Sequence, residues 1–587
     1  MGTSRRSCLL RALFFISCFV LDVDREAASH RIVLYPQPQQ QNSIASGVYR
    51  TAYHFQPPRN WINDPNGPMY FNGVYHVFYQ YNPNAAVWGD MHWGHSVSVD
   101  LINWAPLPLA LAPTAPYDVN GCFSGSATVR RGTHPAVLYT GVNANSEQSQ
   151  NLALPANLSD PVLTNWTKSG HNPLMAAGDD INATNFRDPT TAWRGSDGLW
   201  RAAVGAQIGA NGTALLYRSR DFVRWERASR PLHSSSGSGM WECPDFYPVP
   251  VVGAEGLDTP PAEGEVKHVL KMSLTETQSD HYMLGAYDAA RDVFVPEGEG
   301  AVDDYRAWRR YDHGKFYASK TFFDARRRRR ILWGWLNESD SEADDVAKGW
   351  AGIQIIPRTI WLDSNRRQLI QWPVEEVRSL RKHVVHLQNM KLHAGLREIK
   401  GVKASQADVE VDFELHDLER AQTFDPTRAM DPPRLCAEQD ASVQGGIGPF
   451  GLLVLASEKL EEHTAIFFRV YKDQNAYKVL MCSDQRRSSV WPELDKAVYG
   501  TFLEMDLEKE SKISLRTLID HSVIESFGGG GRACISSRVY PSFFSNASAH
   551  LYLFNNGSSS TTVSGLKAWD MARARLNIRV DELNIEH

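Results

Sequence analysis

The feature that most constrains the fold is a long succession of short β-type segments separated by turns. Runs of β-branched and aromatic residues recur between Gly, Asn, Asp and Pro, and convincing amphipathic helix patterns are few. Examples are "GVYHVFYQYNP", "PAVLYTG", "LWRAAVGAQ" and "RRILWGWLNE". A chain patterned in this way is expected to adopt an all-β fold.

An internal similarity indicates what kind of β fold stands in the N-terminal part. The segment "SVDLINWAPLPL" at 98–109 resembles "SRDFVRWERASRPL" at 219–232; both read Ser-x-Asp-apolar-x-x-Trp and continue to Pro-Leu. Trp104 and Trp225 are separated by about two repeats of roughly 40–60 residues, the length of a propeller blade. The repeat favours a β-propeller.

The character of the sequence changes near residue 380. "EEVRSLRKHVVHLQNMKLHAG" is charged, and later segments such as "ADVEVDFEL", "TAIFFRVYK" and "AHLYLFNN" alternate apolar and polar residues between Gly and Asn turns. This alternation predicts an antiparallel β-sandwich. The predicted organisation is a Gln/Pro-rich flexible leader at 30–47, a propeller at 48–380, a linker at 381–395 and a sandwich at 396–587.

The N-terminus has the features of a secretory signal. Arg5 and Arg6 precede an apolar stretch at 9–21, and the small residues at 27–29 offer a cleavage site. The stretch is short for a membrane span, so we expect residues 1–29 to be removed and the mature protein to have no membrane association. A retained anchor is the alternative.

Sequons and cysteines agree with export. Asn-x-Ser/Thr occurs at Asn157, Asn165, Asn182, Asn211, Asn337, Asn546 and Asn556, which are candidate glycosylation sites. Cys436 and Cys482 both lie in the predicted sandwich and are the expected disulfide. Cys243 could be a thiol nucleophile or a small buried residue. We expect a secreted monomer.

Composition gives no reason to expect a nucleic-acid partner. The net charge is −6 and the sequence pI about 6.4. The basic run at 326–330 lies between "KTFFDA" and "ILWGW", so a solvated hairpin turn is expected there. The 17 Trp, 21 Tyr and 24 Phe residues could serve either sugar stacking or a large core.

Three short motifs place acidic residues beside prolines or aromatics. They are "WINDPNG" with Asp64, "FRDPTTAW" with Asp188, and "WECPDFYPV" with Glu242 and Asp245. Asp before Pro is common turn chemistry, and Pro65 with Asn66-Gly67 predicts a tight turn that presents Asp64. The inner strands of a propeller would bring the three motifs to one central funnel.

Carboxylates gathered in this way suit glycoside hydrolysis. One nucleophile and one proton donor are the minimum for a retaining mechanism, and a third acid can stabilise the transition state. Arg187 could keep Asp188 ionised by charge pairing. An apolar wall of Trp241, Phe246 and Tyr247 could favour the protonated form of Glu242, which suits a general acid.

The ordered motifs "NDPNG", "FYQYNP", "SGSAT", "FRDPT" and "WECPDF", with the later "SVIESFGGGGRACISSRVYP", resemble glycoside hydrolase family 32. This family includes the plant acid invertases and fructan exohydrolases, and the resemblance covers roughly residues 48–587. It implies a five-bladed β-propeller followed by a β-sandwich, and it implies neither a metal nor an organic cofactor.

The resemblance also implies roles for individual residues. Asp64 is similar to the nucleophile that attacks the anomeric carbon of a terminal fructose, Glu242 to the acid/base, and Asp188 to the transition-state stabiliser. The positions that match fructose-contacting residues are Asn63, Gln80, Trp88, Ser124 and Arg187. The implied substrate is a fructan oligo- or polysaccharide, or sucrose.

Two positions bear on the choice between sucrose and fructan as substrate. Invertases of this branch usually carry an Asp, and a basic residue three positions on, after "KxSL"; Thr275 and Gln278 stand there in "KMSLTETQSDHY". Losing these charges removes hydrogen bonds to the glucose side of sucrose and favours a fructan exohydrolase acting on β-2,1 or β-2,6 linkages. Glu276 or Asp280 could substitute after a register shift.

Two aromatic residues would flank the leaving group. The family commonly has Trp where "GCFSGSAT" has Phe123, which with Trp61 would face the leaving-group side. A smaller ring could widen that subsite for a longer chain, or the exchange could be neutral. Pro244 resembles cell-wall invertases and exohydrolases, whereas vacuolar invertases usually carry Val; the cell wall or the vacuole is the expected destination.

Other functions remain as alternatives. A cell-wall acid invertase is the first, and a fructosyltransferase is the second. An inactive fructan-binding homologue should have lost a carboxylate, whereas Asp64, Asp188 and Glu242 are all present. An inverting glycosidase would need more widely spaced carboxyl groups.

Overall fold

The computed structural model of the chain describes residues 47, 49–259, 264–429, 431–543 and 549–585. The expected signal at 1–29, almost all of the leader and the sequon at Asn546 lie outside these residues. Within them the fold is all-β, as predicted, and its α-helices are short: α2 (Glu342–Lys348) and α3 (Pro432–Glu438). Short 3-10 turns are η1 (Gly298–Ala301), η2 (Tyr305–Ala307), η3 (Glu375–Leu380), η4 (Leu418–Arg420), η5 (Pro426–Arg428) and η6 (Val580–Glu582).

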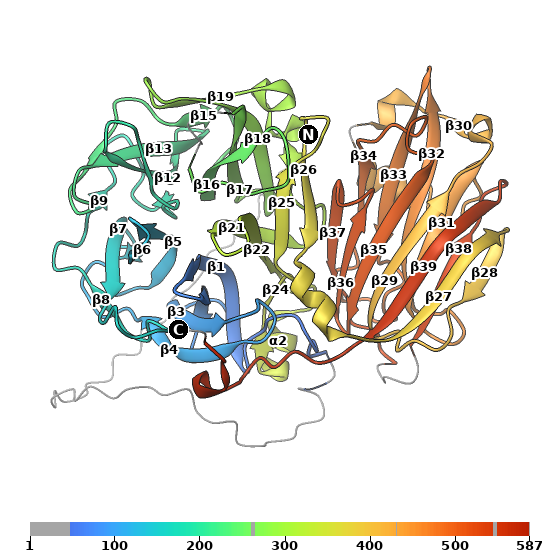
Figure 1. The fold of residues 1–587 in the computed structure, drawn as a ribbon, viewed down its shortest axis with the longest axis horizontal. Coiled ribbons are helices and arrows are strands. Elements are labelled where there is room, and N and C mark those ends of the chain that lie inside the picture. Colours follow the sequence, from blue (N-terminus) through green and yellow to red (C-terminus); the bar gives the residue numbers. More distant parts are fainter. Residues whose placement is uncertain (1–46, 48, 260–263, 430, 544–548, 586–587) are drawn as a thin grey trace, which may run out of the picture.

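Five sheets form from the described strands before residue 374, grouped around a common centre in Figure 1. The first holds β1 (Asn60–Phe71), β2 (Val74–Asn82), β3 (His92–Ser98), β4 (Ala105–Leu111) and β23 (Trp350–Ala351). The second holds β5 (Cys122–Arg130), β6 (His134–Val142), β7 (Gln148–Pro155), β8 (Trp166–Lys168) and β9 (Met175–Ala176). The third holds β10 (Phe186–Arg187), β11 (Trp193–Arg194), β12 (Trp200–Ile208), β13 (Asn211–Ser219), β14 (Trp225–Arg227) and β15 (His233–Ser235).

The fourth sheet holds β16 (Trp241–Pro250), β17 (Val266–Leu274), β18 (Ser279–Asp288), β19 (Val293–Pro296) and β20 (Arg309–Arg310). The fifth holds β21 (Phe316–Asp324), β22 (Arg329–Leu336), β24 (Ile353–Gln354), β25 (Arg358–Leu362) and β26 (Leu369–Pro373). Apart from the parallel pair of β1 and β23, neighbouring strands of these five sheets pair antiparallel. Consecutive hairpins therefore build each sheet outward from its first strand.

The two similar segments occupy equivalent places in the first and third sheets. The turns follow β3 and β13, and in each the serine hydroxyl accepts a hydrogen bond from a backbone N–H, of Leu101 or Phe222, at 2.9 Å. Each tryptophan, Trp104 or Trp225, then donates its indole N–H to the carbonyl oxygen of that same residue at 3.2 Å. The similarity therefore reflects one turn design used in two sheets.

Two six- to seven-stranded sheets form the C-terminal part, at the right of Figure 1. One has the order β27 (Arg381–Leu392), β39 (Thr561–Met571), β29 (Gln406–Glu414), β35 (Lys512–Asp520), β36 (Val523–Gly528) and β37 (Ala533–Arg538). The other has the order β28 (Gly395–Glu398), β38 (His550–Asn555), β31 (Ile447–Ala456), β32 (Thr464–Asp473), β33 (Ala476–Asp484) and β34 (Val498–Leu503), with β30 (Gln422–Thr423) beside β32. Apolar side chains from both sheets form one core.

Residues 381–392, expected to be a linker, are instead strand β27 at the edge of the first of these sheets, where it pairs with β39. Its apolar side chains Val385, Leu387, Met390 and Leu392 pack against the sandwich core, and the other side chains of the strand are exposed or half-buried. The spacing of these apolar residues changes from two to three between Leu387 and Met390, and charged residues stand among them, so the sequence did not predict a strand.

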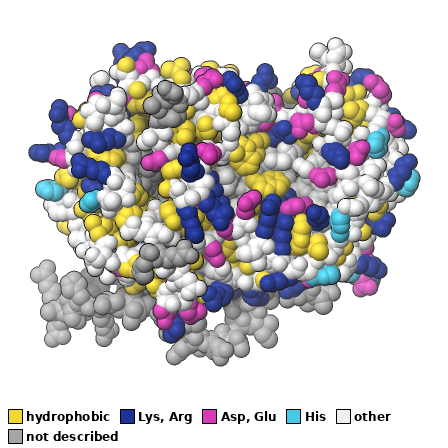
Figure 2. Space-filling view, in the orientation of Figure 1, with side chains coloured by type: hydrophobic (Ala, Val, Ile, Leu, Met, Phe, Trp, Pro, Cys, Tyr) yellow, Lys and Arg dark blue, Asp and Glu magenta, His cyan; other side chains and the backbone are white. Residues whose placement is uncertain are grey.

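The basic run at 326–330 is a hairpin between β21 and β22, as predicted, but only its first part is solvated. Arg329 and Arg330 are buried. Arg329 pairs with Asp324 at 2.8 Å and with Glu376 at 2.5 Å, and Arg330 stacks over Tyr247 at 4.4 Å. Figure 2 shows acidic and basic side chains interspersed over one face of the molecule.

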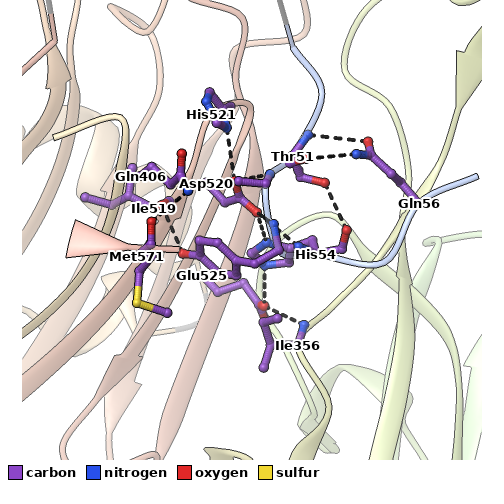
Figure 3. Close-up of polar contacts among 12 residues, drawn as sticks. Thr51, His54, Gln56, Ile356, Gln406, Ile519, Asp520, His521, Glu525 and Met571 are labelled. Carbon is purple, nitrogen blue, oxygen red and sulfur yellow. Dashed lines mark hydrogen bonds and ion pairs between the residues drawn. The ribbon is translucent and has the colours of Figure 1, made fainter. Parts of the chain in front are cut away.

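A buried polar network joins the two parts (Figure 3). His54, just before β1, contacts Asp520 at the end of β35 through Nδ1 at 2.8 Å and Glu525 of β36 through Nε2 at 2.9 Å; all three side chains are fully buried. Glu525 also pairs with Arg358 of β25 at 2.6 Å. Because buried charges are stable only when paired, these contacts fix how the two parts meet.

The C-terminal tail leaves the sandwich and returns to the first sheet. The N–H of Trp104 donates to the carbonyl oxygen of Arg575 at 2.8 Å, and Ile578 and Leu583 pack against Val74 and Val97. The tail therefore ties the two parts together a second time.

The predicted disulfide is present: Cys436 of α3 is bonded to Cys482 of β33. Among the sequons within the described residues, Asn157, Asn165, Asn182 and Asn211 are exposed, and Asn337 and Asn556 are half-buried. None of the described helices is long and apolar enough to cross a membrane.

Candidate active site

A cavity of about 400 Å³ opens where the first strands of the five sheets come together. Each of these strands, β1, β5, β10, β16 and β21, contributes at least one polar residue to it: Asp64, Ser124, Arg187, Glu242 and Tyr317 are examples. The complete lining is Asn63, Asp64, Gln80, Trp88, Met91, Phe123, Ser124, Gln148, Thr184, Arg187, Asp188, Glu242, Gln278, Tyr317 and Trp335.

The first strands are irregular where they reach the cavity. Register shifts occur in β1 after Ile62, in β5 after Phe123, in β16 after Glu242 and in β21 after Tyr317. A bulge leaves residues unpaired and re-aims their side chains. Thus irregular pairing turns polar groups out of the sheets and into the cavity.

Prolines favour two of these bulges. Pro65 and Pro244 cannot donate a ladder hydrogen bond, so they are tolerated where pairing is already broken. The "NDPNG" stretch was expected to be a tight turn, but β1 continues through it as a strand with two register shifts. The motif therefore forms a local bend in β1 that leaves Asp64 at the cavity.

Asp64 is held by short contacts on both carboxylate oxygens. Asn63 Nδ2 donates to Oδ1 at 2.9 Å and Ser124 Oγ donates to Oδ2 at 2.5 Å. Burial, aided by the charges of Asp188 and Glu242, raises the pKa of Asp64 to about 6 against the opposing effect of these hydrogen bonds.

Asp188 is fixed through its backbone and its side chain. Its N–H donates to Thr140 Oγ1 at 2.8 Å, and its Oδ2 accepts from the N–H of Cys243 at 2.9 Å. The residue has φ of 67°, a left-handed conformation that few non-glycine residues adopt. Burial raises the pKa of Asp188 above its ordinary value.

Both carboxylate oxygens of Glu242 accept hydrogen bonds. Arg187 donates to Oε1 through Nε at 3.0 Å and Nη2 at 2.8 Å, and the hydroxyl of Tyr317 donates to Oε2 at 2.5 Å. Arg187 itself is oriented by Gln148 Oε1 at 3.1 Å and by the carbonyl oxygen of Thr184 at 2.9 Å. These hydrogen bonds fix the direction in which Glu242 presents its carboxyl group.

One expectation about the acids holds in part and another is wrong. Arg187 makes its ion pair with Glu242, although its charge also opposes the rise in the pKa of Asp188 that burial causes. Trp241, Phe246 and Tyr247 do not form a wall beside Glu242, because strand alternation and the bulge send these side chains into apolar cores behind the cavity.

The other predicted binding residues are placed as follows. Asn63 and Gln80 line the cavity, and Gln80 Nε2 donates to the carbonyl oxygen of Cys122 at 3.0 Å. Trp88 has 59% of its surface exposed and its ring meets Phe123 edge-on at 5.9 Å. This pair forms an aromatic rim suited to stacking on a sugar ring.

Two residues expected beside the leaving group do not line the cavity. Trp61 donates its indole N–H to Asn63 Oδ1 at 2.8 Å and packs edge-on against Trp335, which does line it. Thr275 donates to the carbonyl oxygen of Met240 at 3.3 Å and lies outside the lining. Gln278, three residues later, reaches the cavity instead.

The remaining acidic candidates have other partners. Asp245 is buried and accepts from Thr321 N at 2.8 Å and Oγ1 at 2.6 Å. Asp280 is fully buried in an ion pair with Lys271 at 2.9 Å, and Glu276 is exposed away from the lining. Hence neither Asp280 nor Glu276 replaces a carboxylate on the leaving-group side.

The lining residues that the sequence did not predict are Met91, Gln148, Thr184, Tyr317 and Trp335. Tyr317 and Trp335 lie in aromatic β segments of the fifth sheet, "KFYASKTFFD" and "ILWGWLN", which have no acidic motif to single them out. Only the tertiary structure brings the Tyr317 hydroxyl to Glu242.

The one acidic cluster with metal-ligand spacing in the described residues lies away from the cavity. It consists of Glu338, Asp340 and Asp345. The ammonium group of Lys348 lies among them, 2.9 Å from Asp345 and 3.3 Å from Glu338, and also contacts Asp340. The lysine supplies the positive charge that a cation would otherwise provide.

Comparison with known proteins shows the family of the chain. Residues 54–373 match the Glycosyl hydrolases family 32 N-terminal domain, and residues 376–570 match the Glycosyl hydrolases family 32 C terminal domain. Beta-fructofuranosidase, insoluble isoenzyme 4, of Oryza sativa subsp. japonica is 57% identical over 94% of this chain and 93% of its own. Fructan 1-exohydrolase w2 of Triticum aestivum is 53% identical over 92% and 91%.

Solved structures give the same result. The crystal structure of fructan 1-exohydrolase IIa from Cichorium intybus matches with a TM-score of 0.88 and 51% identity, over 90% of this chain and 99% of that one. A Glu-to-Gln variant of that enzyme, in complex with 1-kestose, matches equally well. Both domains of the chain are covered, and the protein is therefore a member of glycoside hydrolase family 32.

Proposed function

We propose that this protein is a retaining β-fructosidase that releases terminal fructose from fructans, and that its five N-terminal sheets are the blades of a five-bladed propeller. The observation that carries the proposal is the meeting of Asp64, Asp188 and Glu242 in one cavity with distinct partners for each. Two acids with different surroundings can take different roles in glycoside cleavage.

In the proposed mechanism Asp64 attacks the anomeric carbon C2 of the terminal fructose. The C2–O bond to the leaving group breaks, and Glu242 gives its proton to the departing oxygen. Glu242, now ionised, accepts a proton from water, which attacks C2 and displaces Asp64. Asp188, fixed by Thr140 and Cys243, would hold hydroxyl groups of the fructose ring.

Retention can be tested by trapping the fructosyl group with methanol. The proposed double displacement gives methyl β-fructofuranoside, which NMR distinguishes from the α-anomer. The same mechanism predicts a separation of roughly 5–5.5 Å between the Asp64 and Glu242 carboxyl groups in a crystal structure. The α-anomer as first product would contradict retention.

The preference for fructan rests on the charges of the lining. Its described charged residues are Asp64, Asp188, Glu242 and Arg187, all of which belong to the catalytic acids or contact one. Gln278 is neutral. A site without a spare carboxylate and cation offers sucrose's glucose unit no charge-assisted hydrogen bonds.

A double variant tests this argument. Thr275→Asp with Gln278→Lys should raise kcat/KM for sucrose relative to 1-kestose, because it supplies the missing pair of charges beside the cavity. Glu276→Ala, an exposed neighbour outside the lining, is the matched control and should leave the ratio unchanged. An unchanged ratio in the double variant would remove this basis for the fructan preference.

Sucrose hydrolysis is the second candidate. It is favoured by the 57% identity to a relative named beta-fructofuranosidase, a value close to the 53% identity to a fructan 1-exohydrolase. Because these identities differ little, the substrate comparison at the end of the Discussion decides between the two candidates.

We further propose that the protein is exported as a glycosylated monomer to the cell wall or the vacuole. The exposed positions of Asn157, Asn165, Asn182 and Asn211 support modification there. Protein purified from a plant host should lose mass on treatment with a glycan-releasing amidase and should elute as a monomer. Its N-terminal sequence should begin beyond residue 29.

A further inference from the structure

Behind the cavity, the fourth sheet contains a buried ion pair that touches neither the cavity nor solvent. Lys271 Nζ of β17 lies 2.9 Å from Asp280 Oδ2 of β18, and both side chains have no exposed surface. Neither residue lines the cavity. Burying two charges costs much hydration free energy, and a pair of apolar residues is often as stable. The position of this pair therefore indicates a function other than stabilising the fold.

Lys271 connects the bulges of two neighbouring first strands. Its Nζ donates to the carbonyl oxygen of Cys243 at 3.1 Å, within the bulge of β16. It also donates to the carbonyl oxygen of Ser319 at 2.7 Å, within the bulge of β21. A third contact, to Ser273 Oγ at 2.8 Å, lies on its own strand outside both bulges.

Asp280 holds the second bulge from the other side. Its Oδ1 accepts from the N–H of Ala318 at 3.1 Å and its Oδ2 from the N–H of Ser319 at 2.8 Å. These residues fall in the register shift of β21, where the ladder to β22 is interrupted. Ala318 also has φ of 54°, so this backbone conformation is held by its surroundings.

These two bulges carry the proton-transfer end of the site. Cys243 directly follows Glu242, and Ala318 directly follows Tyr317. Tyr317 donates its hydroxyl hydrogen to Glu242 Oε2 at 2.5 Å. Hence a shift of either bulge would change the distance and direction between these two side chains.

We propose that Lys271 and Asp280 are positioning residues that lock the β16 and β21 bulges together, and so set the placement of Glu242 and Tyr317 for proton transfer to the leaving oxygen. The inference rests on the proposed function of Glu242 as acid/base. It predicts that loss of the pair harms protonation of the leaving group more than it harms binding of the fructose ring.

The double variant Lys271→Met/Asp280→Asn tests this, because it removes both charges and leaves no single buried charge. Turnover should be compared for 1-kestose, whose sugar leaving group needs a proton, and for 4-nitrophenyl β-fructofuranoside, whose leaving group does not. We expect kcat for 1-kestose to fall by at least about ten-fold, with a smaller fall for the aryl substrate and little change in KM.

Two controls separate positioning from general damage. Ser273→Ala removes the Lys271 partner that lies on its own strand and should keep wild-type turnover. Arg201→Met breaks another buried ion pair, Arg201–Asp292 at 2.6 Å, and should lower activity on both substrates equally, if at all. If the double variant does not fold, Lys271→Gln/Asp280→Asn keeps a polar side chain at both positions, likewise leaves no unpaired charge, and should show the same substrate dependence.

Two results would overturn the proposal: turnover of 1-kestose within about two-fold of wild type, or an equal loss on both substrates. Glu242→Gln distinguishes this failure from failure of the proposed function. If Glu242→Gln keeps wild-type turnover of 1-kestose, the acid/base role itself is wrong. If it is inactive while the double variant is normal, only the positioning role is wrong.

Discussion

At the scale of single residues, each acid of the site owes its properties to a few contacts. Asp64 is buried beside two other carboxylates, which raises its pKa to about 6, while Ser124 and Asn63 oppose the rise by donating hydrogen bonds. A nucleophile must be ionised to attack. The activity of the free enzyme should therefore fall as the pH drops through about 6.

Ser124→Ala should move this acidic limit to higher pH. Removing the hydroxyl at 2.5 Å takes away a hydrogen bond to the ionised form, so the pKa of Asp64 should rise further. The measurement is the pH profile of kcat/KM. Ser126→Ala, a buried serine on the same strand, is the control and should leave the profile in place. A limit that moved to lower pH would contradict this view of Asp64.

The three acids of the cavity and their partners Asn63, Ser124 and Arg187 could be located from the sequence, but other neighbours could not. Asp64, Asp188 and Glu242 stand in long motifs whose order resembles a known family. Tyr317 and Gln148 stand in ordinary β segments, and they reach the site only because five sheets converge. The ion pair of Arg187 with Glu242 was missed for the same reason, since Glu242 lies far from it in sequence.

At the scale of elements, the irregular parts of strands place polar residues at the cavity, and they were harder to predict from the sequence than the regular parts. The all-β class and the turn shared by Trp104 and Trp225 followed from periodicity and repetition. The bulges of β1 and β16 were not predicted, because the prolines of both strands and the asparagines of β1 are typical of turns. Strand β27 was missed since its apolar residues change spacing between Leu387 and Met390 and charged residues stand among them.

The disulfide gives a prediction at this scale. Cys436 and Cys482 tie α3 to β33 across a sequence separation of 46 residues. Closing a loop of this length is worth about 4 kcal/mol in the chain-entropy treatment. The double variant Cys436→Ala/Cys482→Ala should thus unfold at lower denaturant concentration.

Catalysis should be unaffected by that change, because neither cysteine lines the cavity. Denaturant unfolding followed by circular dichroism, with kcat/KM measured in parallel, checks both statements. Cys534→Ala, which removes a buried free thiol from the same part of the chain, is the control for the loss of side-chain packing. Equal stability of wild type and double variant would contradict the prediction.

At the scale of the whole molecule, the propeller-like part and the sandwich act as one unit. The His54 network is buried between them, and its hydrogen bonds to Asp520 and Glu525 outweigh burial and raise the pKa of His54 to about 9 (Figure 3). The folded-state pKa thus exceeds the ordinary value of 6.5. The stabilisation is complete below about pH 6.5 and is lost as pH rises through 9.

His54→Gln should therefore cost about 3 kcal/mol below pH 6.5, and this cost should shrink as the pH approaches 9. Thermal unfolding at several pH values measures the difference between variant and wild type. His550→Gln, which breaks a partly exposed His–Glu398 pair of 2.7 Å, is the matched control and should change stability little. A cost that grew with pH would show that the sign is wrong.

We propose that the cavity accepts fructans in preference to sucrose. The most direct measurement is kcat/KM of the purified, full-length protein for 1-kestose and inulin against sucrose under one set of conditions. Fructose should be released from the fructans with the higher kcat/KM, because the described lining offers the glucose unit of sucrose no spare charged pair. A higher kcat/KM for sucrose would contradict it.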